Sequence, residues 1–200
     1  CFEQTSSSTY PNIMVLNYLQ ATDTAEPAVK KRALDLIKKG YRRLVGYECK
    51  KNGYEWFGGD PGHEALTAYG IMEFIDMAKV YDGVEQEMIQ RTVRWILARR
   101  DGKGGFERNS RALDSFGRAS QEVTNAYIVW ALSEARIREI DKEVKATVKT
   151  AYKSKNPYLI SLALLALTNH DPDGGDAQEL LGMLKGAKSE DASFPGDGRS

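Results

Sequence analysis

The sequence predicts an all-α fold, an α/α toroid built of helical hairpins. Apolar residues recur at helical spacing nearly throughout the 200 residues, and no alternation typical of β-strands persists. Segments rich in glycine and aromatic residues, at 53–59 and 102–106, each precede a more apolar helix. A polar outer helix, a Gly-aromatic loop and an apolar inner helix thus repeat, which favours two concentric layers. An α-solenoid stays open as the alternative, because periodicity alone does not separate the two folds.

The first four expected helices each carry apolar residues on one face. Residues 11–21 begin with Pro11, and proline fits the first helical turn because its missing N–H has no helical partner there. Residues 26–47, 63–81 and 84–99 follow, with charged positions between the apolar ones. The basic runs among them are best interpreted as solvated helix faces, and nucleic-acid binding is a poor second interpretation.

The second four expected helices span residues 121–137, 142–153, 157–168 and 177–185. The range 157–168 is apolar on almost every side, which is typical of a buried helix. Residues 192–198 resemble a further Gly-aromatic loop, yet no inner helix follows. We therefore expect residues 1–200 to be a fragment of a single domain, an incomplete ring of about eight helices that lacks its C-terminal helices.

The composition excludes several classes of protein. Lys plus Arg and Asp plus Glu both number 28, so no global charge favours nucleic acid. The two cysteines, Cys1 and Cys49, allow one disulfide but no disulfide scaffold. The longest apolar stretch, residues 160–167, is too short to span a bilayer. We expect no nucleic-acid partner and no direct membrane insertion, and no targeting segment in the sequence reports its compartment.

The tetrapeptide Cys1-Phe2-Glu3-Gln4 sets a thiol and a carboxamide three positions apart. If Cys1 Sγ attacks the Gln4 side-chain carbonyl and ammonia leaves, an internal β-cysteinyl-γ-glutamyl thioester closes. Such a bond acylates nucleophiles, because a thiolate with a pKa near ~8.5 leaves far more readily than an amide nitrogen. Two other interpretations of a first-position cysteine compete: a mature lipoprotein and a self-processed N-terminal-nucleophile hydrolase.

Several segments, taken in order, carry a family resemblance. The chain resembles the thioester-containing domain of the α-2-macroglobulin and complement family, whose motif reads Gly-Cys-Gly-Glu-Gln. Cys1, Glu3 and Gln4 match that motif, and Phe2 replaces its second glycine, as in bacterial members. The resemblance covers essentially the whole chain, and its further matches lie at residues 10–19, 33–41, 66–69, 95–97 and 105–106.

The resemblance implies an α/α toroid and a function in covalent entrapment. In that family a protease cuts a bait region elsewhere in a large protein, the thioester becomes exposed, and a lysine amine of the protease is acylated. We therefore expect a single-use acylating trap and endopeptidase inhibitor, not a turnover enzyme. Its partners would be target endopeptidases and other domains of the same parent chain. Bacterial relatives imply an extracellular or periplasmic location, in a secreted or membrane-anchored lipoprotein parent.

The resemblance also assigns roles in the chemistry. Cys1 supplies the thiol leaving group and Gln4 the acyl carbonyl. Glu3 orients the loop or aids ammonia loss, and a plain surface carboxylate is the competing interpretation. In this family a residue after the second Gly-Phe loop selects the nucleophile: a histidine directs acylation to hydroxyls, whereas aspartate or asparagine leaves direct attack to amines. The alignment puts Asp114 there, which predicts amine preference; otherwise Asp114 caps a helix or turn.

Aromatic residues near the motif could shield the bond. Phe2 and Tyr10 follow it in sequence, and Trp56 and Phe57 lie in the next loop. The alternative is that these side chains simply fill the core between helical layers. The two histidines, His63 and His170, are expected at helix ends, as a hydrogen-bonding terminal residue and a C-terminal cap.

We expect no metal and no cofactor. The isolated histidines do not form a zinc pattern, and an acidic stretch beginning at Asp171 fails the calcium-loop pattern because Gly182 occupies the position of its terminal glutamate. Two other functions remain as alternatives. An α/α-toroid enzyme would need an Asp-rich metal cluster or a carboxylate pair in its inner ring. A passive helical binding module would leave Cys1 unreactive.

Overall fold

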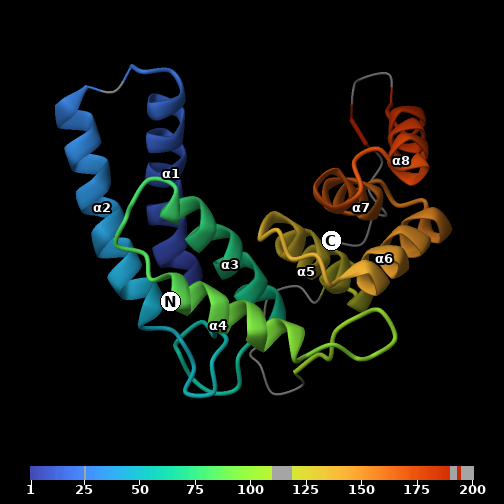
Figure 1. Ribbon diagram of the computed structural model, residues 1–200, viewed down its shortest axis with the longest axis horizontal. Coiled ribbons are helices and arrows are strands. Elements are labelled where there is room, and N and C mark those ends of the chain that lie inside the picture. The colour runs from blue at the N-terminus through green and yellow to red at the C-terminus, as the bar shows by residue number, and fades with distance from the viewer. Residues whose placement is uncertain (25, 110–118, 190–192, 195–200) are drawn as a thin grey trace. The chain divides into compact units, whose positions relative to one another are not determined.

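The computed structural model describes residues 1–24, 26–109, 119–189 and 193–194. Within these ranges the secondary structure is helical, apart from two isolated β-bridges (Figure 1). The eight helices are α1 (Phe2–Ala21), α2 (Pro27–Val45), α3 (Glu64–Ala78), α4 (Gln86–Leu97), α5 (Gln121–Glu134), α6 (Asp141–Ser154), α7 (Pro157–His170) and α8 (Gly175–Gly186). The all-α class is confirmed, with the helix content expected of an α/α toroid, and the incomplete ring stays a prediction.

The chain forms two compact units. The first contains Cys1–Ala98 together with Asn109, and so holds α1 to α4. The second contains Arg99–Arg108 and the described residues from 119 onward, and so holds α5 to α8. The motif at residues 1–4 therefore belongs to the first unit.

Helix α1 begins nine residues earlier than expected, at Phe2 rather than Pro11. The prediction of a first-turn proline was wrong, because Pro11 lies inside the helix. Apolar periodicity missed this part because its inward positions are polar: Thr5, Ser6 and Thr9 are all buried. The thioester motif consequently lies on the first turn of a long helix and not in a loop.

The other seven helices agree with the expected ranges to within three residues at each end. Local capping explains several of these boundaries. Asn156 accepts hydrogen bonds from the first-turn N–H groups of α7, and Pro157 occupies its first position. Ser120 caps α5 in the same way. The end of α6 is marked by Lys155 in the left-handed conformation, with φ of 54°.

In the first unit, α1 packs against both α2 and α3 (Figure 1). The approach to α2 is close at Gly40, where an added Cβ would lie 2.1 Å from Thr9 Oγ1. Glycine at position 40 lets α2 approach α1 closely, because a side chain there would overlap that of Thr9. The remaining core is rich in aliphatic and aromatic side chains, including Ile13, Leu16 and Phe74.

In the second unit, α7 packs against α5, α6 and α8. Leu159 and Leu162 of α7 meet Ala126 of α5, and Tyr127 and Trp130 pack against this cluster. The expected burial of α7 is confirmed for one face of the helix, whereas Tyr158 and Leu165 are exposed.

Two hairpins share one backbone pattern ahead of α3 and α5, whereas the expected outer and inner helix layers stay a prediction. The first hairpin, residues 47–55, contains a bridge between Glu48 and Tyr54, and the second, residues 99–107, a bridge between Arg100 and Phe106. Each closes with the same backbone bond, from Cys49 N to Gly53 O and from Asp101 N to Gly105 O, both at 2.9 Å. One backbone design therefore precedes α3 and, in the next repeat, α5.

Candidate functional site

Cys1 and Gln4 meet on the first turn of α1. Cys1 is the N-cap residue and Gln4 the third helical residue, and the two form a capping box. Gln4 Oε1 accepts a hydrogen bond from the Cys1 nitrogen at 3.2 Å, while the Cys1 side chain faces the Gln4 backbone N–H. The local helical geometry therefore places the thiol-bearing and carboxamide-bearing residues on the same turn, each side chain against the other's backbone.

The two faces of this turn differ sharply. Glu3 and Gln4 are exposed and Cys1 is half-buried, whereas Phe2, Thr5 and Ser6 are buried. The residues of the candidate chemistry thus lie on the outer side of α1. The residues between and after them fix the helix to the rest of the unit, and the exposure of Glu3 fits its interpretation as a surface carboxylate.

The Phe2 ring lies in an aromatic socket formed by Tyr47, Tyr54, Tyr69 and Phe74. Its centroid lies 5.5 Å from that of Tyr54 and between 6.1 and 6.5 Å from the other three, with edge-to-face geometry. Backbone bonds add to this anchor, because Phe2 N donates to Trp56 O at 2.9 Å. Phe2 is fully buried, as the core-packing alternative requires, and its role in shielding a thioester stays a prediction.

The other aromatic candidates occupy different environments. The Trp56 ring lies edge-on to His63 with a centroid distance of 4.8 Å, and Phe57 is 70% exposed. Tyr10 donates to Asp76 Oδ2 at 2.6 Å, and burial followed by this acceptor raises the pKa of its hydroxyl. The Trp56 carbonyl contacts the motif turn directly, but shielding by Tyr10, Trp56 or Phe57 stays a prediction.

A buried carboxylate supports the segment beneath the motif. Glu55 is 6% exposed, and its Oε2 accepts from Phe57 N at 2.8 Å and from Gly59 N at 3.3 Å. Oε1 is buried without a hydrogen-bond partner among the described residues. Residue spacing does not single out Glu55, and its position between Tyr54 and Trp56 in a glycine-rich loop is the one signal that the sequence offers.

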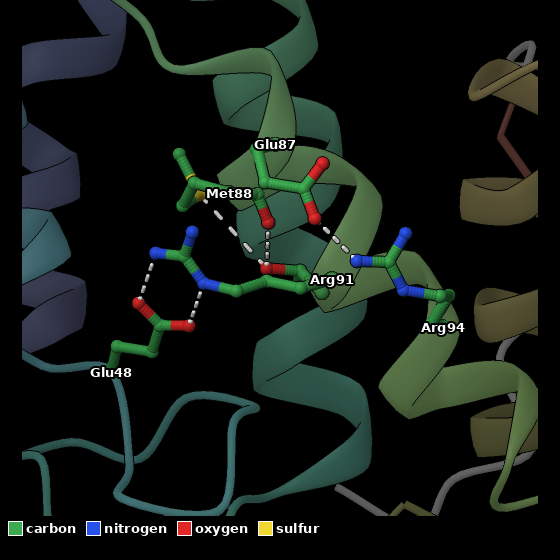
Figure 2. Close-up of polar contacts among 6 residues, drawn as sticks. Glu48, Glu87, Met88, Arg91 and Arg94 are labelled. Carbon is green, nitrogen blue, oxygen red and sulfur yellow. Dashed lines mark hydrogen bonds and ion pairs between the residues drawn. The ribbon is translucent and has the colours of Figure 1, made fainter.

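A bidentate ion pair fixes the first hairpin to α4 (Figure 2). Arg91 Nε and Nη2 donate to the two carboxylate oxygens of Glu48 at 2.6 and 2.7 Å. Hydrogen bonding to Glu48 raises the pKa of Arg91. On the same helix, Arg94 pairs with Glu87 on the exposed surface, as Figure 2 shows. The Glu48 pair holds the hairpin that carries Tyr54 of the socket.

The remaining thiol and the two histidines have structural roles. Cys49 is free and 3% exposed, and burial raises its pKa to about 11, so it is an inert thiol as expected of a buried cysteine. His63 caps α3, accepting from Leu66 N through Nδ1 at 3.2 Å. His170 lies in the last turn of α7 and pairs with Asp141 at 2.9 Å. Both histidines lie at helix ends, as expected.

Asp114, the candidate for nucleophile selection, lies outside the described residues. The last described residue before it is Asn109, which is anchored to the first unit. Asn109 N donates to Glu64 Oε2 at 3.2 Å, and its side-chain amide donates to Gly62 O at 3.3 Å. The role of Asp114 therefore stays a prediction.

Neither a metal centre nor a membrane span is found in the part of the chain that the structure describes. No group of three or more His, Cys, Asp or Glu side chains within the described ranges is placed to hold a metal ion. Likewise, none of the described helices combines the length and apolar character needed to cross a membrane.

The described residues thus form an all-helical domain with a cysteine and a glutamine on the first turn of its first helix. The family model of the A-macroglobulin TED domain matches residues 1–194, and the chain belongs to this family. The chain is also 24% identical, over 176 residues, to thioester-containing protein 1 allele S1 of Anopheles gambiae. That match covers 84% of the chain and 13% of the mosquito protein, so the chain spans a small part of its relative's length.

Proposed function

We propose that Cys1 and Gln4 close an internal thioester and that this domain is the acylating part of a larger protease-trapping protein. The capping box at the start of α1 carries the proposal, because it holds the Gln4 side chain against the Cys1 backbone and the Cys1 side chain against the Gln4 backbone on the same turn. In the closing step Cys1 Sγ attacks the Gln4 side-chain carbonyl carbon, an S–C bond forms, and the amide nitrogen leaves as ammonia. In the acylating step an amine takes the acyl group and Cys1 leaves as a thiol.

The position at a helix N-terminus supports both steps. The first-turn N–H groups of α1 give this end a partial positive charge, which stabilises a thiolate. A more stable thiolate is a larger fraction of the attacking thiol in the first step and a better leaving group in the second. The exposed outer face of the turn gives an external nucleophile a path to the acyl carbon.

The proposed targets are lysine amines of endopeptidases. The proposed site of action is extracellular or periplasmic, where such proteases attack. The trap works once, because the amide that forms is stable. Other domains of the parent chain would supply the bait region and cover the exposed turn until cleavage. Family membership supports these assignments, and the mosquito relative's name describes it as thioester-containing.

Mass spectrometry of freshly purified protein tests the bond. We expect a mass one ammonia below that of the sequence, and methylamine should open the ring and label the Gln4 peptide. Cys1→Ala and Gln4→Ala should abolish both effects, whereas Cys49→Ala, a matched cysteine control in the core, should preserve them. A full sequence mass without methylamine uptake would reject the trap and favour a binding module with an unreactive Cys1.

Nucleophile choice is tested at Asp114. Asp114→His should raise acyl transfer to glycerol several-fold relative to methylamine, because an imidazole can attack the thioester and release the thiolate as a base. The ratio of glycerol to methylamine adducts is read by mass spectrometry of the Gln4 peptide. An unchanged ratio would refute the assignment of the selecting position to Asp114 while leaving the thioester itself standing.

A further inference from the structure

A buried carboxyl group lies beneath the motif turn. Glu73 of α3 is fully buried, and its Oε2 accepts a hydrogen bond from Ser6 Oγ at 2.5 Å. The same Ser6 hydroxyl lies 2.6 Å from the Tyr69 hydroxyl. Glu73 Oε1 is also buried, and no described residue gives it a hydrogen bond. The three side chains form one polar contact between α1 and α3, which the proposed chemistry does not use.

This contact is continuous with the anchor of the motif. Ser6 follows Gln4 by two residues and lies one helical turn after Phe2, on the same buried face of α1. The Phe2 ring packs edge-to-face on Tyr69, and an added Cβ at Gly70 would lie 3.1 Å from its Cζ. Tyr69 thus contacts both Phe2 and Ser6, so whatever moves Ser6 away from α3 also moves the turn that bears Cys1 and Gln4.

We propose that Glu73 is a positioning residue for the Cys1–Gln4 reaction: its neutral carboxyl group holds the first two turns of α1 on α3, and its ionisation releases them. This inference rests on the proposed thioester function. Glu73 touches neither reacting atom in this account and acts through Ser6 and the Phe2 anchor.

The electrostatic surroundings favour the neutral carboxyl group. Burial raises the pKa of Glu73 to about 7, and the Ser6 hydrogen bond offsets only part of this rise. The titratable groups that interact with Glu73 are the hydroxyls of Tyr10 on α1 and Tyr69 on α3. Neither is a cation, so neither supplies a charge that would favour the carboxylate.

The charged groups that act on the same tyrosines do not favour the carboxylate either. Glu3 on α1 and Asp76 on α3 are both carboxyl groups, so neither supplies a positive charge. On α4, Arg91 is paired with Glu48. Ionised Glu73 therefore has to gain water, which it can do where α1 separates from α3.

The direction of the pH effect follows from the raised pKa. Packed Glu73 holds its proton up to about pH 7, whereas a solvated glutamate loses it near its ordinary pKa of 4.5. The packed state binds more protons between these values, so its advantage is complete below pH 4.5 and declines as the pH rises to 7. Above about pH 7 Glu73 is ionised in both states, so a further rise in pH no longer changes the balance between the packed and released states.

The test compares thioester hydrolysis in wild-type and Glu73→Gln protein from pH 5 to 9 by loss of methylamine uptake. Glutamine keeps the acceptor for Ser6 but does not ionise. The wild-type rate divided by the variant rate should rise several-fold with a midpoint near pH 7. The surface variant Glu87→Gln should keep the wild-type profile. A ratio that is constant with pH would overturn the inference.

Two further variants distinguish a failure of the Glu73 role from a failure of the proposed thioester function. Ser6→Ala removes the hydrogen bond that lowers the pKa of Glu73, so the midpoint should move to higher pH; an unmoved midpoint would reduce Ser6 to ordinary packing and contradict the positioning role. Cys1→Ala protein cannot form the thioester, yet its thermal unfolding should show the Glu73 titration. Absence of the thioester at every pH rejects the proposed function, whereas a flat ratio with an active thioester rejects only the role of Glu73.

Discussion

The first and second hairpins share a backbone but differ in what they support. In both, an aromatic residue follows the glycine that closes the loop, and it is buried: Tyr54 in the first and Phe106 in the second. Both aromatic N–H groups are satisfied by a polar side chain of the next helix, from Thr67 at 2.8 Å and from Asn125 at 3.1 Å. The hairpin is therefore a repeated connection whose buried aromatic residue is tied to the helix that follows it.

The attachments around each hairpin make the difference. The first adds the buried carboxylate of Glu55, the Glu48–Arg91 pair and the Trp56 carbonyl that holds Phe2. At the matching positions the second has Arg100, which donates to Glu139 O, and Glu107, which pairs with Arg99 on the surface. The repeated backbone therefore contributes to the fold in both hairpins. The side chains added to the first hairpin support the turn that bears Cys1 and Gln4.

The largest expected effect on stability comes from substituting Gly53, the glycine that closes the first hairpin. Gly53 has φ of +73°, and an added Cβ would lie 2.7 Å from Trp95 Cε2. Gly53→Ala combines left-handed strain with overlap and should cost about 3 kcal/mol of unfolding free energy in urea titrations. Gly102, in the second hairpin, is a control matched in backbone angle and not in position: its φ is +71° but nothing lies within 4 Å of an added Cβ, so Gly102→Ala should cost only about 1 kcal/mol. Equal costs would show that packing on Trp95 contributes nothing.

The sequence predicted the repeat but not the buried polar residues that support the turn of Cys1 and Gln4. Glycine and aromatic residues mark the hairpins directly, and the apolar run at 157–168 marks α7. By contrast, Thr5, Ser6 and Thr9 gave no helical signal, because burial of small polar residues depends on Gly40 and Glu73 across the interface.

The buried carboxylates escaped sequence reasoning for a related reason. Glu73 lies on an apolar helix, yet its environment is set by Ser6, which is far away in the chain. Glu55 lacked any periodic pattern. Burial of a charged residue is a tertiary property, so spacing along one helix cannot report it.

A smaller effect on the free energy of unfolding is expected at the two ion pairs of α4. Glu48→Gln leaves Arg91 without its bidentate partner at a half-buried position and should lower the unfolding free energy by about 1.5 kcal/mol. Glu87→Gln removes the exposed partner of Arg94 on the same helix and should change stability by less than about 0.5 kcal/mol. Both values come from urea unfolding at one pH. Matching losses would mean that the hairpin gains no support from Arg91.

Methylamine incorporation with peptide mapping tests most directly whether the turn held by the first hairpin bears a Cys1–Gln4 thioester. We expect one methylamine on Gln4 and a newly free Cys1 thiol, both absent from Cys1→Ala protein and retained in Cys49→Ala protein. An unlabelled Gln4 in protein whose mass shows no loss of ammonia would contradict the thioester.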